Sequence, residues 1–428
     1  MAAISKETLR TDAQYALELD AQDVLSGFRE RFHIPKDASG KPEAYFCGNS
    51  LGLMPKAARA LIEAELDRWA RLGVEGHVDG ETGWKDYHEL LTEAGAQLVG
   101  AKNSEVVFMN TLTVNLNLLM SSFFRPTPER NCILAEGHSF PSDRYAMLGQ
   151  LGIHGYDEKH LIEVFPKAGA HTPKTEQFLE IIEKDGDKIA LLLLGGVNYY
   201  TGQVFEMHTL AAAARKKGIV VGLDLAHAVG NVPLHLHDWD IDFAVWCSYK
   251  YLNGGPGAVA GAFVHERIGA QFKGPRLAGW WGHDKASRFK MPPDFIPISG
   301  AEGWQQSNPP ILSMVPLRAS LPLFAEAGLE RLQEKSSRLT TYLRELILSL
   351  ERPELSILTP AEPQGCQVSV FVENRGKELF DHLSRAGIVA DWREPNVIRM
   401  APVPLYNSFA DVYRIYEAIR SFWNTNQR

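Results

Sequence analysis

The sequence has little cysteine, no long apolar run and no large excess of charge of one sign. Its four cysteines are spread over 428 residues without a CxxC pair, which excludes a disulfide-rich secreted scaffold and favours a reducing compartment. The longest apolar run, Ile189 to Leu194, is far shorter than the roughly 20 residues that cross a bilayer. The N-terminal stretch carries charges throughout and does not resemble a secretory signal. We therefore expect a cytoplasmic protein that makes no membrane contact.

The charges nearly balance. Lys and Arg number 44 and Asp and Glu number 52, which gives a net charge of −8, and no basic block is present. Such a chain is not expected to bind nucleic acid or anionic lipid as its main partner. With 45% hydrophobic and 22% charged residues, the composition is that of a globular protein with a large core rather than a disordered chain.

Short apolar runs alternate with helical patterns from residue 105 onward. The patterns predict strands at 105–110, 131–137, 188–197, 219–225 and 241–251, and helices at 175–186 and 210–217. Strands that are apolar throughout and are separated by helices are typical of a parallel sheet covered on both faces.

The pattern changes after about residue 311. A stripe of leucines predicts a long helix over 329–353, and Ser408 is expected to cap a final amphipathic helix. Between them, the patterns predict a small α+β unit from the segments 365–373, 379–388 and 396–404.

We therefore predict an α/β fold. Its large domain holds a mixed, mainly parallel sheet covered by helices, and a smaller α+β domain follows at the C-terminus. The predicted divisions are an N-terminal segment at 1–60 that packs with the small domain, the large domain at 61–310 and the small domain at 311–428.

Two strand ends carry the residue types of one particular chemistry. Asp224 ends one apolar strand, and Tyr249 and Lys250 end the next, ahead of a glycine-rich loop. Ligands of such sheets bind beyond the carboxyl ends of the strands. A lysine at a strand end is usually a solvated surface group, but here the apolar context favours a partly desolvated, nucleophilic amine with a lowered pKa. Pyridoxal phosphate uses such a pair, because it forms a Schiff base with a lysine while an acid keeps its ring nitrogen protonated.

Longer segments support this interpretation. The stretch at 222–266, which contains GLDLAHAVGN and SYKYLN, closely resembles the kynureninase family of fold-type-I pyridoxal-phosphate enzymes. SYKYLN alone is typical of the wider superfamily, whereas SNPP at 307–310 and APVPLYNSF at 401–409 narrow the resemblance to kynureninases. The resemblance implies hydrolytic cleavage of the Cβ–Cγ bond of L-kynurenine or 3-hydroxy-L-kynurenine. The products are anthranilate or 3-hydroxyanthranilate and L-alanine.

The resemblance assigns roles at the two strand ends. Lys250 matches the lysine that binds the cofactor covalently, and Asp224 matches the partner of the ring nitrogen. Tyr249 matches a tyrosine that contacts the phosphate and is suited to proton transfer. His227 is similar to a histidine that lies near the cofactor, and the alternative for it is a purely structural hydrogen bond.

Further cofactor contacts are implied elsewhere in the chain. Leu112 and Thr113 match a pair at a helix N-terminus, where free N–H groups and the helix dipole favour an anion such as phosphate; without the resemblance, Thr113 would be a plain N-cap. Phe140 matches the aromatic ring that stacks on the cofactor, and Asp143 a neighbouring polar contact. Gly195 stands where many relatives carry Ser or Thr, so it can contribute only its backbone.

The substrate pocket follows from the same resemblance. Arg399 matches the arginine that binds the α-carboxylate, for which a planar bidentate partner is suited. Ser50, His77, Ser307 and Asn308 match positions at the aryl end of the pocket. Because such polar groups suit a ring hydroxyl, we hypothesise a preference for 3-hydroxykynurenine over kynurenine.

The resemblance also implies a second subunit. Trp280 and Asn308 match residues that reach the cofactor site from the other chain of a dimer. We therefore expect a homodimer whose active sites are shared between its subunits.

Three alternatives remain open. The HxHD spacing of His235, His237 and Asp238 can indicate metal ligands, but we expect a surface turn and predict no metal site. Another fold-type-I activity, such as a cysteine desulfurase or a class V aminotransferase, is the nearest enzymatic rival. A desulfurase needs a mobile cysteine, whereas Cys366 is expected to be a small core residue. The last alternative is a catalytically silent relative that serves as a binding module.

Overall fold

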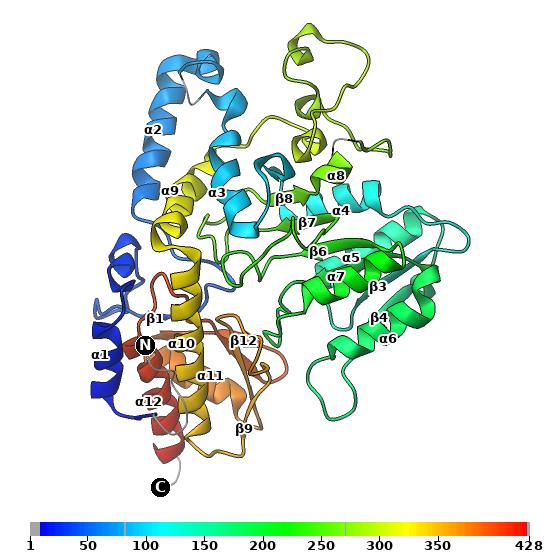
Figure 1. The fold of residues 1–428 in the computed structure, drawn as a ribbon. Coiled ribbons are helices and arrows are strands. Elements are labelled where there is room, and N and C mark those ends of the chain that lie inside the picture. The colour runs from blue at the N-terminus through cyan, green and yellow to red at the C-terminus, as the bar shows by residue number, and fades with distance from the viewer. Residues whose placement is uncertain (1–8, 81–82, 270, 426–428) are drawn as a thin grey trace.

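The centre of the protein is a seven-stranded mixed sheet in the part of the chain that the structure describes, which comprises residues 9–80, 83–269 and 271–425 of a computed structural model (Figure 1). The strand order is β2-β8-β7-β6-β5-β3-β4. The strands are β2 (Val106–Phe108), β3 (Cys132–Glu136), β4 (Leu161–Val164), β5 (Ile189–Gly195), β6 (Val220–Asp224), β7 (Phe243–Trp246) and β8 (Gly261–Val264). β8 runs antiparallel to both of its neighbours, whereas the pairings from β7 through β4 are parallel. The predicted mixed, mainly parallel sheet is confirmed.

The sheet is covered on both faces because its strands alternate between two cores. Leu192 and Leu194 of β5 pack in one apolar cluster, and Leu191 and Leu193 pack in another. The first cluster is shared with helices of one face and the second with those of the other. The covering helices are α3 (Glu89–Val99), α6 (Thr175–Asp185), α7 (Met207–Lys216) and α9 (Ile311–Ala327) with the first cluster, and α4 (Leu112–Phe123) and α5 (Pro141–Ile153) with the second.

One predicted strand is too long, and two strands were not predicted. The strand predicted over 241–251 ends at Trp246, because the chain turns out of the sheet there and the N–H of Gly254 donates to the carbonyl of Ser248. The patterns also missed β4 and β8. β4 contains the charged Glu163, and β8 begins with a glycine after a glycine-rich loop, so neither stands out as an apolar strand.

The C-terminal part contains a four-stranded antiparallel sheet of order β12-β13-β10-β9. Its elements are α10 (Leu329–Leu348), β9 (Leu355–Ile357), β10 (Val368–Val372), α11 (Gly376–Arg385), β12 (Asp391–Arg393), β13 (Val397–Met400) and α12 (Phe409–Thr425). The predicted helix over 329–353 is confirmed but ends at Leu348, ahead of Pro353. Ser408 caps α12 as predicted, since its Oγ accepts the N–H of Asp411 at 3.0 Å.

The N-terminal segment packs against this C-terminal part. β1 (Ala44–Tyr45) pairs in parallel with β11 (Ile388–Val389). Asp20, near the end of α1 (Ala13–Ala21), accepts the N–H groups of Phe409 and Ala410 at the start of α12. In Figure 1, α1 and α12 lie side by side at the lower left, and α2 (Ala57–Leu72) packs with α9 above them. The divisions at residues 60 and 310 stay a prediction, and residues 1–8 and 426–428 of the predicted terminal segments lie outside the described residues.

The side chains of Lys335 and Asp23 form a buried ion pair between α10 and the N-terminal segment. Lys335 Nζ lies 2.7 Å from Asp23 Oδ2, and the two side chains are 6% and 4% exposed. Removing one partner leaves the other charge buried and unpaired, so we expect Lys335→Met to lower the free energy of unfolding by about 3–5 kcal/mol in chemical denaturation.

Two control variants make this test specific. Lys377→Met removes an exposed pair with Asp381 and should cost about 1 kcal/mol or less. The double variant Asp23→Leu/Lys335→Met should recover most of the loss. A loss for Lys335→Met no larger than for Lys377→Met would contradict this account.

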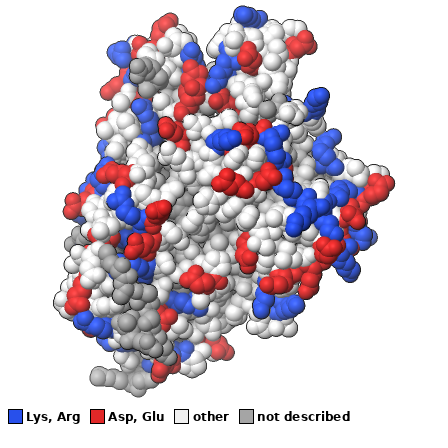
Figure 2. Space-filling model, in the orientation of Figure 1, with Lys and Arg blue, Asp and Glu red and all other residues white. Residues whose placement is uncertain are grey.

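On the face drawn in Figure 2, acidic and basic side chains are intermingled. No helix among the described residues is both long and apolar enough to cross a membrane.

Candidate active site

The polar residues predicted at the strand ends meet in one cavity. β7, β6, β5 and β3 are consecutive neighbours in the sheet, and Lys250, Asp224, Gly195 and Glu136 lie at or just beyond their carboxyl ends. The cavity has a volume of about 250 Å³. The predicted site residues that line it are Ser50, Leu112, Thr113, Phe140, Asp143, Gly195, Asp224, His227, Tyr249, Lys250 and Arg399.

Lys250 points to a neutral histidine. Its Nζ lies 2.9 Å from Nε2 of His227, which is 6% exposed. Burial, with the positive charges of Lys250, Arg399 and Arg393, lowers the pKa of His227 well below its ordinary value. His227 therefore stays neutral, and its Nε2 accepts a hydrogen bond from the amine of Lys250.

Two aspartates form an acid pair beside this amine. Burial and the charge of Asp224 raise the pKa of Asp143 well above its ordinary value. Burial also raises the pKa of Asp224, but this rise is opposed by the N–H of Ala226, which donates to Oδ1 at 2.8 Å, and by Lys250. Of the two, Asp224 is the carboxylate and Asp143 holds the proton.

Two helices begin at the opposite wall of the cavity. α4 begins at Leu112 without a side-chain cap, which leaves the N–H groups of its first turn available to an anion. α5 begins beside it, with Phe140 as its N-cap residue. The hydroxyls of Thr113 and Ser142 lie 2.9 Å apart and link the two helix starts.

A buried arginine at the cavity is held in place by an acid. Arg399 is 1% exposed, and its Nη2 and Nε donate to the two carboxylate oxygens of Asp391 at 2.7 and 3.3 Å. Arg393 also pairs with Asp391, with Nε 2.9 Å from Oδ1. Because both arginines line the cavity and share one aspartate, that wall carries net positive charge, which suits a carboxylate ligand.

Seven lining residues were not predicted: Asn49, Glu136, Ser142, Val197, Tyr199, Ala226 and Arg393. Glu136 is a polar residue at the end of an apolar strand, so the rule that found Asp224 also indicates it. Tyr199 and Arg393 reach the cavity through tertiary contacts that leave no local signal in the sequence.

Four predicted residues do not line this cavity within one chain. His77 ends the 3₁₀ helix η2 (Gly73–His77) and packs against Trp84 with ring centroids 5.4 Å apart. Trp280 begins η7 (Trp280–Gly282) and is 41% exposed. Ser307 and Asn308 lie on an exposed turn before α9. Trp280 and Asn308 are the two residues that were predicted to act on a second subunit's site.

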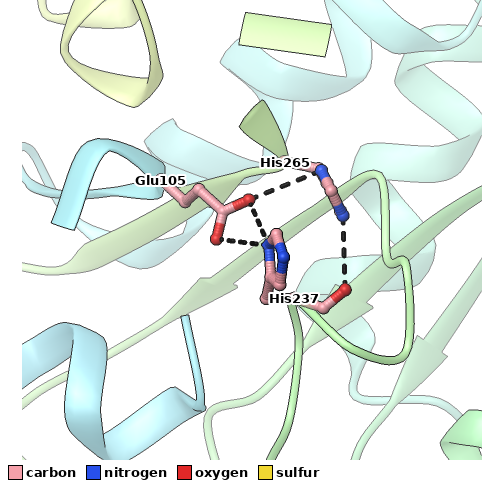
Figure 3. Close-up of side chains that lie close together, drawn as sticks. All are labelled: Glu105, His237 and His265. Atoms are coloured by element: carbon pink, nitrogen blue, oxygen red, sulfur yellow. Dashed lines mark hydrogen bonds and ion pairs between the residues drawn. The ribbon is translucent and has the colours of Figure 1, made fainter. Parts of the chain in front are cut away.

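The HxHD segment does not act as one unit. His235 and Asp238 are exposed, as expected of a surface turn, but His237 turns inward, toward Glu105 and His265 (Figure 3). His237 Nδ1 lies 2.9 Å from Glu105 Oε1, and this oxygen also accepts the N–H of Glu266.

The third member of this group, His265, is engaged in the same way. Its Nδ1 accepts the N–H of Arg267, and its Nε2 lies 3.3 Å from the carbonyl of His237. These hydrogen bonds hold the three side chains together at the edge of the sheet opposite the cavity.

The cavity fits pyridoxal phosphate by the chemistry of its groups. An amine and a carboxylate lie at neighbouring strand ends, and free N–H groups of α4 face the same space. Nδ1 of His227 and Oδ1 of Asp143 are buried without a hydrogen-bond partner, as expected of atoms that face a ligand. Lys250, Asp224, Leu112 and Thr113 would hold the amine-reactive aldehyde, the ring nitrogen and the phosphate of such a cofactor.

Comparison with known proteins agrees with this chemistry. The chain is 52% identical over 410 residues to the kynureninase of Koribacter versatilis, with 95% of this chain and 97% of that protein covered. It is also 52% identical to the kynureninase of Myxococcus xanthus, over 95% of this chain and 96% of that protein. The chain belongs to the kynureninase family. Residues 332–419 match the family model described as the kynureninase C-terminal domain.

Solved structures that resemble this kynureninase-family fold support the architecture. The cysteine desulfurase CsdA from Escherichia coli superposes with a TM-score of 0.76 at 17% identity, covering 94% of this chain and 98% of that chain. The cystine C-S lyase C-DES, in complex with its product cysteine persulfide, superposes with a TM-score of 0.74 at 18% identity, covering 88% and 97%. Cys366, considered above as the mobile cysteine that a desulfurase needs, is 1% exposed and packs in the core as predicted.

Proposed function

We propose that the protein is a pyridoxal-phosphate-dependent kynureninase that hydrolyses the Cβ–Cγ bond of L-kynurenine or 3-hydroxy-L-kynurenine. The products are L-alanine and anthranilate or its 3-hydroxy form. The observation that carries this proposal is the convergence of Lys250, Asp224 and Arg399 on one cavity in a chain that is about half identical to kynureninases over nearly its full length.

Arg399 and its neighbours would orient the substrate. The guanidinium is fixed by Asp391 and by the carbonyl of Tyr199, which accepts from Nη1. A guanidinium held in this way offers its remaining N–H groups to the α-carboxylate without loss of side-chain freedom on binding. The second arginine, Arg393, adds positive charge at the same wall.

Lys250 and Tyr249 are the groups placed to move protons. Lys250 Nζ would remove the proton from the substrate Cα, and Nε2 of His227 orients this amine. Burial raises the pKa of Tyr249, so its phenol keeps its proton and can deliver it to the carbon that becomes part of alanine. Pyridoxal phosphate, when bound, supplies the electron sink that stabilises negative charge at the substrate's carbon atoms.

We also propose a homodimer in which Trp280 and Asn308 complete the site of the partner subunit. Several apolar side chains near Trp280 in the sequence are exposed. Leu277, Phe289 and Met291 are 56%, 60% and 66% exposed, and single-chain exposure of this extent over one segment favours a protein contact. We propose the cytoplasm as its location, in keeping with four free cysteines.

The substrate preference is tested with two substrates in parallel. If polar residues at the aryl end of the pocket bind the ring hydroxyl, the kcat/KM for 3-hydroxykynurenine should be about 10-fold above that for kynurenine. This factor is the selectivity that one or two added hydrogen bonds provide. Anthranilate or 3-hydroxyanthranilate release, followed spectrophotometrically, measures both. A higher kcat/KM for kynurenine would refute the preference. Release of sulfide from cysteine without either aryl product would instead favour a desulfurase.

A further inference from the structure

Glu136 is a buried carboxyl group at the cavity to which the roles above give no task. It ends β3, which is separated from β7 by β6 and β5 in the sheet, is 4% exposed and lines the cavity. Its Oε2 accepts Nδ2–H of Asn198 at 2.9 Å, and its Oε1 accepts the N–H of Gly195 at 3.3 Å. Both of these partners are donors, so neither of them accepts a hydrogen bond from this carboxyl group.

Gly195 leaves the space that this carboxyl group occupies. A Cβ atom on residue 195 would lie 2.6 Å from Oε1 of Glu136, so the carboxyl group of Glu136 would have to shift from its position. The side chain of Glu136, from the neighbouring strand, therefore takes the position that a side chain of residue 195 would take at the cavity wall.

We propose that Glu136 is a positioning residue whose neutral carboxyl group donates a hydrogen bond to the bound cofactor, and that Gly195 is the residue that makes room for it. This inference rests on the proposed function, because it takes the cofactor to be pyridoxal phosphate. The hydrogen-bond donor to the cofactor would then be Glu136 on β3, in place of a hydroxyl side chain at position 195 on β5.

Burial, with the nearby charge of Asp224, keeps Glu136 neutral. The ionisable groups that face it are Asp224 on β6, Asp143 on α5 and the phenol of Tyr199. Burial, and then the charge of Asp224, raise the pKa of Glu136 to about 8, against the opposing effect of the Asn198 and Gly195 hydrogen bonds. Lys250 acts on the two aspartates rather than on Glu136. At pH 7, Glu136 therefore carries the proton that a donor needs, and it loses this proton as the pH rises through about 8.

The test is the binding of pyridoxal phosphate to the full-length apoprotein, followed by fluorescence titration at pH 7 and pH 9. In the wild type, the fraction of protein in which Glu136 is protonated falls about tenfold between pH 7 and pH 9. Loss of this proton should therefore raise the Kd for pyridoxal phosphate by up to about tenfold. Glu136→Gln keeps a donor that cannot ionise. We expect its Kd at pH 7 to be within about threefold of the wild-type value. The rise in its Kd between pH 7 and pH 9 should be smaller than the wild-type rise by up to about tenfold.

Removing the carboxyl group of Glu136 and crowding it with a methyl group on residue 195 should weaken cofactor binding to a similar extent. Glu136→Ala is expected to weaken binding at pH 7 by about fivefold to tenfold, the effect of one buried hydrogen bond. Gly195→Ala should weaken binding by a similar factor, and the double variant should be no worse than Glu136→Ala alone. Glu105→Gln, at an equally buried carboxyl group on the opposite edge of the sheet, is the matched control and should leave binding unchanged at both pH values.

The outcomes separate the two proposals. Equal pH dependence in wild type and Glu136→Gln, or additive losses in the double variant, would overturn the role of Glu136. A wild-type protein that binds no pyridoxal phosphate at either pH would overturn the proposed function, and with it this inference. The comparison between wild type and Glu136→Gln decides the question even if Glu136→Ala does not fold.

Discussion

Lys250→Ala is expected to lower kcat for kynurenine hydrolysis by about 10³- to 10⁴-fold or more. The substitution removes the only lysine amine that lines the cavity among the described residues, and with it both the covalent attachment point and the proton-transferring group. The His227 ring that accepts from this amine loses its partner but stays neutral, and the Asp224 carboxylate loses the nearby charge of Lys250 but keeps the N–H of Ala226. The protein should therefore fold.

The measurement is single-turnover and steady-state aryl-product release, with the visible absorption of the cofactor as a second readout. Lys184→Ala removes an exposed lysine on α6 and is the matched control, with activity expected at the wild-type level. Activity within tenfold of wild type for Lys250→Ala would contradict the assignment, provided that circular dichroism shows a folded protein.

The second large effect is a difference in kcat between substitutions of two neighbouring carboxyl groups, Asp224 and Asp143. Asp224→Asn removes the charged member of the pair and should lower kcat by about 10²- to 10³-fold, because the ring nitrogen loses the anion that keeps it protonated. Asp143→Asn replaces a protonated carboxyl group with a neutral amide of the same shape, so the loss should be about tenfold or less. The difference follows from the raised pKa of Asp143, which burial and the charge of Asp224 maintain.

The two variants are each other's controls, since both side chains are 7% exposed. Both are measured for kcat and KM and for the pH dependence of the bound cofactor's absorption. A loss for Asp143→Asn equal to that for Asp224→Asn would contradict the assignment of the proton to Asp143.

The strand ends of this site were predictable from the sequence for a physical reason. A parallel sheet brings the carboxyl ends of its strands to one edge, so polar residues that directly follow apolar runs, such as Asp224 and Lys250, had to lie near each other. The same argument indicates Glu136, which ends the apolar strand β3. Arg399 could be assigned only through the resemblance to kynureninases, because its run in β13 does not distinguish it from other strand residues.

Other parts of the site depend on contacts that sequence patterns do not encode. Tyr199 lines the cavity because its carbonyl is held by Gln367 and Arg399 from the C-terminal part. Arg393 lies there because β12 pairs with β13. The helix starts at Leu112 and Phe140 were predicted as anion and ring contacts, yet the hydroxyl contact that joins them, between Thr113 and Ser142, depends on how α4 packs on α5.

The central claim is that the amine of Lys250 captures the aldehyde of pyridoxal phosphate. The most direct measurement is to load the wild-type protein with pyridoxal phosphate, reduce it with borohydride, digest it and map the added mass by tandem mass spectrometry. The account predicts one phosphopyridoxyl group per chain, on Lys250. Stoichiometric labelling of a different lysine, or a fully loaded protein with no label on Lys250, would contradict it.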